Sequence, residues 1–394
     1  MNKMYKNALA LLVICLIAAG VMYVLLKDRE GQDIAENTAT PVASSPADSE
    51  PSETPPVTPS ETSSETPEAT NPEPTEERPG KLVRTDYENF RPNEAGEIPV
   101  IMFHRFVETY EAGMDKEFTT TFSEFEELLE TLYDKGFRLI SMRDFIECNI
   151  DVPAGTMPMV FTFDDGTSGQ FSLIEENGTL KVNPKSAVGI MMAFNEKHPD
   201  FGLKGIFYVN MDIGDNTFSG AGSLKDRFRF LLDNGLELGS HSWGHVNYKT
   251  DAKTAGKIIE SLGKNQEAAY AVINNLEFYS LALPYGSLPE SEELRHLLRE
   301  GTYNDVHYEH KSILAVGSNP SKAPISADYN PNYVPRIRAQ GIESVIQDLT
   351  WWLPKMTPDR MFVSDGDPDT IVVPEKMRDR VDVSKLNGKK LVVY

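Results

Sequence analysis

Two adjacent carboxylates are among the residues of this sequence best suited to carry out chemistry. Asp164 and Asp165 follow the apolar, β-branched run Val160–Phe163, which predicts a buried strand, and they precede Gly166. Successive side chains of a strand point to opposite faces, so the two carboxylates serve different purposes unless the strand has already ended. A surface turn is the alternative, since Asp-Gly is a common turn dipeptide. The end of a buried parallel strand, however, is where α/β barrels place their catalytic groups.

A pair of histidines suggests metal chemistry. His241 and His245 are four residues apart, and on a helical turn this spacing puts two imidazoles on one face. With a carboxylate from another strand they would form a set of two histidines and one carboxylate, which suits a divalent metal with open positions. A structural histidine pair in a loop is the alternative. The pair directly follows the predicted strand Leu236–Ser240, which favours a metal site.

The elements that must position these residues alternate between strand and helix, which predicts parallel β/α construction. Asn177-Gly178, within Glu175–Val182, predicts an inserted hairpin. The predicted strands are Ile98–Phe103, Phe137–Ile140, Met159–Phe163, Gly205–Asn210, Leu236–Ser240, Phe278–Leu283 and Ile313–Val316. The predicted helices are Thr121–Leu132, with Ser123 and Glu126 as a capping box, Met142–Cys148, Ala187–His198, Leu224–Asp233, Lys253–Asn274 and Glu290–Glu300.

Most of these strands end in polar or conformationally special residues. These residues are His104, Asp164-Asp165, Asn210, His241 and Pro284-Tyr285. In a barrel of β/α units the strand ends converge on one rim, so we expect these side chains to share a site.

Three short motifs resemble those of a known family. Thr162–Gly166 and His241–His245 resemble the first two signature motifs of the NodB-homology polysaccharide deacetylases (carbohydrate esterase family four), and Pro284–Gly286 resembles the core of the third. Their order and spacing also match, over roughly residues 98–340. The resemblance implies a distorted (β/α) barrel that removes acetyl groups from N-acetylated polysaccharide. The alternatives are an acetyl-ester hydrolase on xylan-like glycans and a non-catalytic glycan-binding relative.

The resemblance also implies roles for individual residues. Asp165, His241 and His245 are expected to hold a divalent metal, with zinc expected and cobalt or nickel as alternatives. Asp164 is expected to be the general base. The backbone N–H of Tyr285 is expected to hold the developing oxyanion together with the metal.

Two departures from the family pattern point to its circularly permuted branch. Ala282 stands where most members have an arginine that pairs with the catalytic Asp, and the Leu-x-His tripeptide that follows Tyr285, Leu294–His296, falls within the predicted helix Glu290–Glu300. Ile101–Arg105 is similar to the N-terminal strand of permuted members such as the deacetylases of biofilm poly-N-acetylglucosamine. On that basis His104 is the expected general acid, with a buried first-strand histidine as the alternative. Arg336 is the expected partner of Asp164, and Arg338 is the other candidate.

The composition limits the possible partners. The chain has 394 residues and a formal net charge of −22, which argues against nucleic acid because phosphate binding needs a basic surface. The two cysteines, Cys15 and Cys148, supply no disulfide framework.

The N-terminus predicts a membrane anchor. Lys3 and Lys6 precede Ala8–Leu26, nineteen residues without a charge. This is near the ~20 residues needed to cross a bilayer, and basic residues ahead of the span place the rest of the chain outside. A cleaved signal peptide with a site at Ala18–Gly20 is the alternative, although the apolar run continues past that site. We therefore expect residues 1–30 to anchor an extracellular protein, which would be secreted if the segment is cleaved.

The remaining segments complete the expected organisation. Residues 31–80 carry ten prolines, eleven acidic residues and no aromatic residue, which predicts a disordered, self-repelling spacer. We expect the deacetylase domain over residues 81–345 and a C-terminal extension over 346–394, with short strands at Phe362–Ser364 and Thr370–Val373. Trp351-Trp352 is interpreted as a core or lid contact, with a sugar-stacking platform as the alternative.

Overall fold

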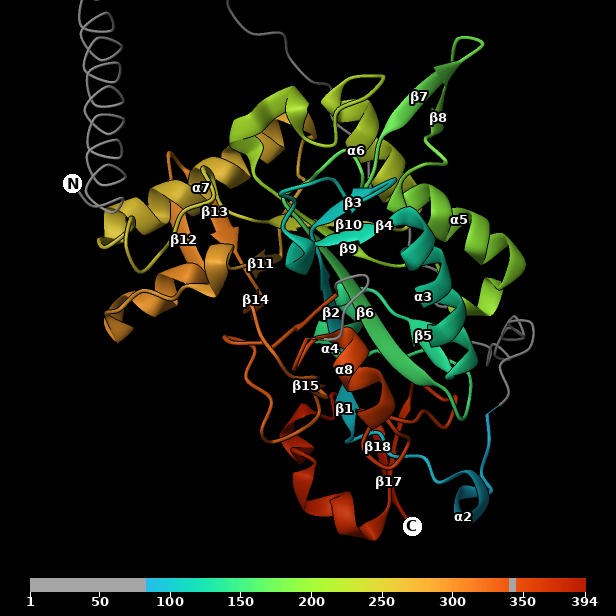
Figure 1. Cartoon of the computed structure of the whole chain (residues 1–394). Coiled ribbons are helices and arrows are strands. Elements are labelled where there is room, and N and C mark those ends of the chain that lie inside the picture. Colours follow the sequence, from blue (N-terminus) through green and yellow to red (C-terminus); the bar gives the residue numbers. More distant parts are fainter. Residues whose placement is uncertain (1–82, 340–344) are drawn as a thin grey trace, which may run out of the picture. The chain divides into compact units, whose positions relative to one another are not determined.

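The computed structural model describes residues 83–339 and 345–394 (Figure 1). The expected anchor at Ala8–Leu26 and the expected spacer at residues 31–80 lie outside these ranges. Within the two ranges, no helix combines the length and apolar character needed to span a bilayer.

An eight-stranded parallel sheet forms the centre of the fold and confirms the α/β class. The strand order is β14-β11-β10-β9-β6-β2-β16, and β5 pairs with the first half of β6. The strands are β2 (Val100–Phe103), β5 (Phe137–Leu139), β6 (Met157–Asp164), β9 (Ile206–Val209), β10 (Glu237–Ser240), β11 (Ser280–Ala282), β14 (Ser312–Leu314) and β16 (Ile337–Arg338). The longest strand, β6, is buried along its whole length and ends at Asp164.

The sheet curls so that its two edges approach each other. Leu314, the last residue of edge strand β14, forms a parallel bridge with Val334. Val334 lies three residues before β16, the strand at the opposite edge. The segment from Val334 to β16 thus bridges the edges, and all strand ends on the carboxyl side face one rim.

The inside of the curled sheet is filled by apolar side chains from its own strands and from the C-terminal segment. Val100, Val160 and Leu314 belong to the same buried cluster as Phe362 and Ile371. In Figure 1 the C-terminal residues, in red, lie below the sheet at the end opposite strands β3 and β4. Residues 361–373 therefore plug one end of the sheet, and the rim formed by the carboxyl ends of the strands is at the other end.

The C-terminal segment contains one small sheet and a short helix. Strand β17 (Thr370–Val373) pairs in parallel with β18 (Lys390–Val393), as part of the appended sheet predicted from sequence. The predicted strand at Phe362–Ser364 does not form, because Val363 makes only an isolated bridge to Asn93. Trp352, in α8 (Leu349–Trp352), is buried and donates its indole N–H to the carbonyl oxygen of Ser318 at 2.8 Å. It is a core residue and offers no face for sugar stacking.

Helices pack on the outside of the sheet (Figure 1). Helices α3 and α5 lie side by side, and α7 lies on the other flank. Their apolar faces bury residues such as Phe125 and Leu129 of α3 and Ile258 of α7. The helices are α2 (Tyr87–Phe90), α3 (Phe122–Asp134), α4 (Met142–Glu147), α5 (Ala187–Lys197), α6 (Leu224–Asp233) and α7 (Ala255–Val272).

The start of α3 differs from the predicted one. Thr121 caps the helix, and its hydroxyl accepts from the backbone N–H of Glu124 while the Glu124 carboxylate accepts from the N–H of Thr121. The predicted capping box of Ser123 and Glu126 is therefore wrong by two residues. The short strand β4 (Thr119–Thr121) leads straight into the helix, so the first of the available hydroxyls takes the cap.

Two hairpins leave the sheet. The predicted one is confirmed as β7 (Leu173–Glu176) and β8 (Thr179–Val182), with positive φ at both turn residues. The other begins at the end of the predicted helix Glu290–Glu300, which forms only as a shorter 3₁₀ helix. A 3₁₀ turn over Glu292–Leu298 is followed by β12 (Glu300–Tyr303) and β13 (Val306–Glu309). Asn304 and Asp305 both adopt positive φ, as a two-residue hairpin turn requires.

Candidate active site

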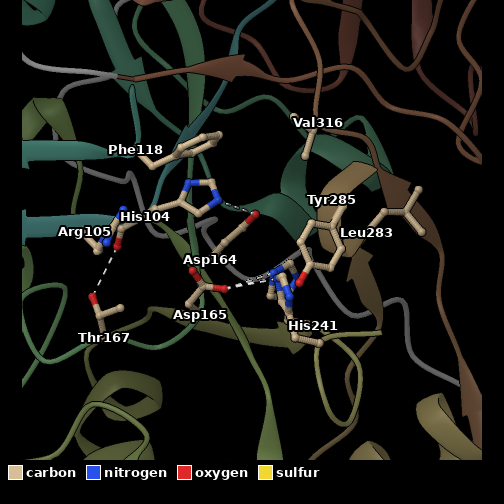
Figure 2. A pocket seen from close by; sticks show the side chains of 11 residues that line it. His104, Arg105, Phe118, Asp164, Asp165, Thr167, His241, Leu283, Tyr285 and Val316 are labelled. Carbon is tan, nitrogen blue, oxygen red and sulfur yellow. Dashed lines mark hydrogen bonds and ion pairs between the residues drawn. The ribbon is translucent and has the colours of Figure 1, made fainter. Parts of the chain in front are cut away.

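A cavity of about 480 Å³ opens at the carboxyl ends of β2, β6 and β10 (Figure 2). It collects most of the residues singled out from the sequence. Figure 2 shows His104, Arg105, Phe118 and Thr167 on one side of the cavity and Leu283, Tyr285 and Val316 on the other. The cavity is lined by His104, Arg105, Phe118, Asp164, Asp165, Thr167, His241, His245, Leu283, Tyr285 and Val316.

Three of these residues form a candidate metal site. One ligand atom each from Asp165, His241 and His245 can be chosen so that all lie within 4.8 Å of one another. Oδ1 of Asp165 is 3.4 Å from Nε2 of His241 and 3.6 Å from Nε2 of His245. Two imidazoles and one carboxylate, partly open to the cavity, match the ligands of a catalytic zinc ion.

The orientation of His241 supports metal binding. Its Nδ1 lies 2.9 Å from the carbonyl oxygen of Ala282, so Nδ1 carries the proton and donates it there. Nε2 faces Asp165 at 3.4 Å and is the atom that would bind a metal in place of its proton. A ligand histidine that donates its other N–H to a backbone carbonyl is the usual arrangement around protein-bound zinc.

The backbone around the triad adopts conformations that most residues avoid. Asp165, Ser242 and His245 have φ of 78°, 64° and 47°, and each such position costs of order 1–3 kcal/mol. Asn210, at the end of β9, holds this backbone by donating to the carbonyl oxygens of His241 at 2.5 Å and Ser242 at 2.7 Å. The left-handed turn at Asp165 also explains how two adjacent carboxylates separate: Asp164 turns into the sheet and Asp165 toward the cavity.

Asp164 forms a buried ion pair with Arg336. Both guanidinium NH2 groups donate to the carboxylate, each at 2.7 Å, and the side chains are 1% and 0% exposed. Arg336 also donates to Thr162 Oγ1 at 3.1 Å and to the carbonyl oxygen of Ala315 at 2.9 Å. Arg338, the other candidate, donates instead to Glu117 at 2.6 Å. Arg336 therefore fills the place of the arginine absent at Ala282.

This pairing decides the charge of Asp164. Burial alone would raise the pKa of the Asp164 carboxyl, but Arg336 and then His241 outweigh burial, so the pKa lies below its ordinary value. Asp164 is therefore ionised at neutral pH. Burial similarly opposes ionisation of Asp165, and its two histidine neighbours lower the pKa of its carboxyl.

His104 lies beside Asp164 at the same rim. Its Nε2 is 3.9 Å from Oδ2 of Asp164, and its ring packs edge-on against Phe118. Gln170 donates to the carbonyl oxygen of His104 at 2.5 Å. Among the described residues Nδ1 of His104 has no hydrogen-bond partner, and burial lowers the pKa of the imidazole in spite of Asp164. The His104 ring lines the cavity. A purely structural core histidine would not need to lie there.

Two histidines that follow Tyr285, His307 and His310, do not reach this cavity. His310 is buried outside the cavity, with its Nδ1 2.7 Å from the carbonyl oxygen of Leu298, and burial lowers its pKa to about 4. His307 belongs to β13, away from the rim. Neither shares a cavity with Asp164.

Tyr285 lies on the apolar side of the cavity. It has a φ of 56°, and its ring packs against that of His245 at 4.6 Å while remaining 65% exposed. The structure thus brings Tyr285 to the metal site. The role of its backbone N–H stays a prediction.

Sequence reasoning missed several supporting residues. Thr162, Gln170 and the carbonyl of Ala282 hold Arg336, His104 and His241, respectively. Thr162 lies inside the first motif, so its side chain was the one available signal. Gln170 and a backbone carbonyl have no local pattern that marks them.

Part of the chain matches a family model, and several solved structures are similar to it. Residues 152–304 match the family model described as "Polysaccharide deacetylase". No curated protein matches the chain. Among solved structures, the Streptococcus pyogenes deacetylase PplD in complex with acetate is 13% identical, with a TM-score of 0.46 and coverage of 67% of this chain and 96% of that one.

Two other solved structures are similar in extent. A de-N-acetylase from Aggregatibacter actinomycetemcomitans is 12% identical at a TM-score of 0.44, covering 63% of this chain and 97% of that one. IcaB from Ammonifex degensii is 15% identical at a TM-score of 0.42, covering 63% of this chain and 94% of that one.

Proposed function

We propose that this chain, whose residues 152–304 match the polysaccharide deacetylase family model, removes N-acetyl groups from an amino-sugar polysaccharide with a bound divalent metal. One observation carries the proposal. The triad of Asp165, His241 and His245 opens into the same cavity as Asp164 and His104. This shared cavity supports a reaction in which the triad binds the metal, Asp164 is the base and His104 is the acid.

The residues of the site divide the reaction between them. A divalent cation on the triad would supply Lewis acidity that polarises an acetyl carbonyl and acidifies water. Asp164, ionised by its contact with Arg336, accepts the proton of the attacking water. Each of its oxygens accepts one hydrogen bond from Arg336, which leaves a second lone pair on each for this proton.

The remaining steps fall to His104 and Tyr285. His104, on the Asp164 side of the cavity, donates a proton to the leaving amine nitrogen. The backbone N–H of Tyr285, on the opposite side, donates to the developing oxyanion. We also propose that Ala8–Leu26 anchors the enzyme in the membrane with its catalytic domain outside the cell.

An assay of the full chain on acetylated glycans tests the proposed function. The panel pairs N-acetylated amino-sugar oligomers with O-acetylated xylan fragments, before and after treatment with a chelator. We expect acetate release from the N-acetylated arm, its loss on chelation, and its return on adding zinc. Release from the ester arm alone would assign an esterase, and no release from either arm would indicate a glycan-binding relative.

His245→Ala is expected to weaken zinc binding at least about tenfold. Removing a residue that only hydrogen-bonds to a metal ligand already costs about tenfold or more, and His245 would be a ligand itself. His245 is partly exposed, so the fold should persist. Zinc content after dialysis and a thermal unfolding curve measure the two effects. His296→Ala, on the exposed 3₁₀ turn, is the matched control and should keep its zinc. Equal zinc content in both variants would contradict the metal assignment.

His104→Ala is expected to lower kcat by roughly 10²–10⁴-fold, the usual contribution of a positioned general acid, with zinc content unchanged. A general acid must be protonated, so wild-type activity should fall at high pH. Because burial lowers the pKa of His104, this fall should begin at a lower pH than an exposed histidine would give. The variant should lack this limb in its pH–rate profile. An unchanged limb would mean that another group is the acid.

A further inference from the structure

Arg105 is a cationic residue of the cavity for which the reaction described above has no use. It directly follows His104 and lines the same cavity. Figure 2 shows it on the side of His104 and Thr167, across from Leu283 and Tyr285. Among the described residues, no hydrogen bond or ion pair of its guanidinium is found.

Local structure keeps the Arg105 side chain exposed. Arg105 begins β3 (Arg105–Val107), which pairs in parallel with β4, with Arg105 opposite Thr119. Side chains alternate along a strand, so the buried side chain of Phe106 fixes Arg105 on the exposed face.

The nearby acidic residues are already paired with other cations. Glu108 contacts Lys185 at 3.0 Å, and Glu117 contacts Arg338 at 2.6 Å. In a chain of net charge −22, acidic partners are plentiful, yet Arg105 is left without one.

The other charged groups of the cavity each have a partner or a role of their own. Asp164 is neutralised by Arg336, and Asp165 with two histidines supplies one negative charge toward a divalent cation. Arg105 therefore adds a positive charge that the protein does not compensate.

We propose that Arg105 is a specificity-determining residue that binds an anionic group on a sugar unit next to the acetylated one. A guanidinium binds a carboxylate or a phosphate through two parallel hydrogen bonds, which a neutral sugar cannot match. The substrate class is then an anionic amino-sugar polysaccharide. The inference rests on the proposed function and deepens it.

Matched oligosaccharides and the full chain test this proposal. One N-acetylated amino-sugar oligomer is used neutral, with one carboxylate, and with one phosphate. The readout is the ratio of kcat/KM for each anionic oligomer to that for the neutral oligomer. We expect a ratio of about ten or more for the wild type with at least one anionic arm, the scale of one hydrogen-bonded charge. The arm with the larger ratio identifies the anion.

Variants separate the guanidinium from general charge effects. Arg105→Gln should bring the ratio to about one, and Arg105→Lys should restore part of it, because a lysine keeps the charge and loses the paired geometry. Arg229→Gln, on the exposed side of α6, removes the same charge away from the cavity and should leave the ratio as in the wild type. A wild-type ratio near one, or an unchanged ratio in Arg105→Gln, would overturn the proposal.

A binding measurement distinguishes failure of this proposal from failure of the proposed function. Calorimetric titration of the anionic oligomers needs no turnover. If the wild type hydrolyses none of the three oligomers, the proposed function fails. The role of Arg105 then stands only if anionic oligomers bind the wild type about tenfold or more tightly than they bind Arg105→Gln, and it is overturned if both bind alike.

Discussion

Asp164→Asn is expected to lower kcat by roughly 10²–10⁴-fold while the zinc content stays at the wild-type value. An amide oxygen cannot accept the proton of the attacking water at neutral pH, whereas Asp165 and both histidine ligands remain in place. Acetate release under saturating substrate, together with metal analysis, measures both quantities. Asp233→Asn, on the exposed surface of α6, is the control for a lost carboxylate and should be fully active.

The same substitution also leaves the guanidinium of Arg336 buried without a counter-charge. Its remaining acceptors, Thr162 Oγ1 and the carbonyl oxygen of Ala315, are both neutral. Unfolding must therefore be measured alongside turnover, at a temperature where the variant is folded. A folded, zinc-loaded Asp164→Asn protein with wild-type turnover would show that Asp164 is not the base.

Arg336→Gln is expected to lower the free energy of unfolding by about 3–5 kcal/mol, the cost of leaving one member of a buried ion pair without the other. Both side chains of the pair are almost completely buried, so solvent cannot replace the lost partner. Arg338→Gln is a closely matched control, since its contact with Glu117 is partly exposed and should be worth at most about 1 kcal/mol. Urea unfolding of both variants gives the comparison, and equal losses would contradict the assignment of Arg336.

The Arg336→Gln effect should depend on pH in a defined direction. In the wild type, Arg336 and His241 outweigh burial and hold the pKa of Asp164 below the unfolded value of 3.8. The stability from this group is present above that value and is lost as the pH falls through the folded pKa. Without Arg336, burial raises the pKa of Asp164, so the variant loses stability as the pH rises. The difference between the two proteins should therefore be larger at about pH 7 than at about pH 4.

A double variant separates charge from packing. Asp164→Asn with Arg336→Met removes both buried charges, and each single substitution leaves one of them. The double variant should be more stable than Arg336→Gln alone, because replacing a whole buried pair often costs little. A double variant whose loss equals the sum of the single losses would mean that the two residues act independently.

The sequence predicted the elements whose signals are local. Asn177-Gly178 specified a tight hairpin, and the apolar run before Asp164 specified the central strand. The motif residues reached one rim because parallel strands with helical connections must place their carboxyl ends together. The match to the polysaccharide deacetylase family confirms the resemblance drawn from those motifs.

What the sequence did not predict depended on distant contacts or on competing local signals. The sequence predicted Ser123 as the helix cap, whereas Thr121 caps the helix because strand β4 runs up to it. The predicted helix Glu290–Glu300 became a 3₁₀ turn, and a hairpin with its turn at Asn304-Asp305 comes after it. Both pack against α7, a contact that the local pattern does not show. Arg336 and Arg338 are two residues apart, so on a strand both side chains would face the same way. Choosing between them required the register of β16 against β2 at the edge of the sheet, which the sequence does not give.

The place of β2 in the sheet has a consequence for how the protein is made. This early strand pairs on one side with β16, so Ile101 must wait for Ile337 to leave the ribosome. The core under the sheet also needs Phe362 and Ile371, which are made later still. Contacts so far apart in sequence form slowly and leave apolar strands uncovered in the nascent chain, where they promote aggregation. A prematurely terminated chain that ends before Arg336 would contain all three of the motifs that resemble the deacetylases and no completed active site.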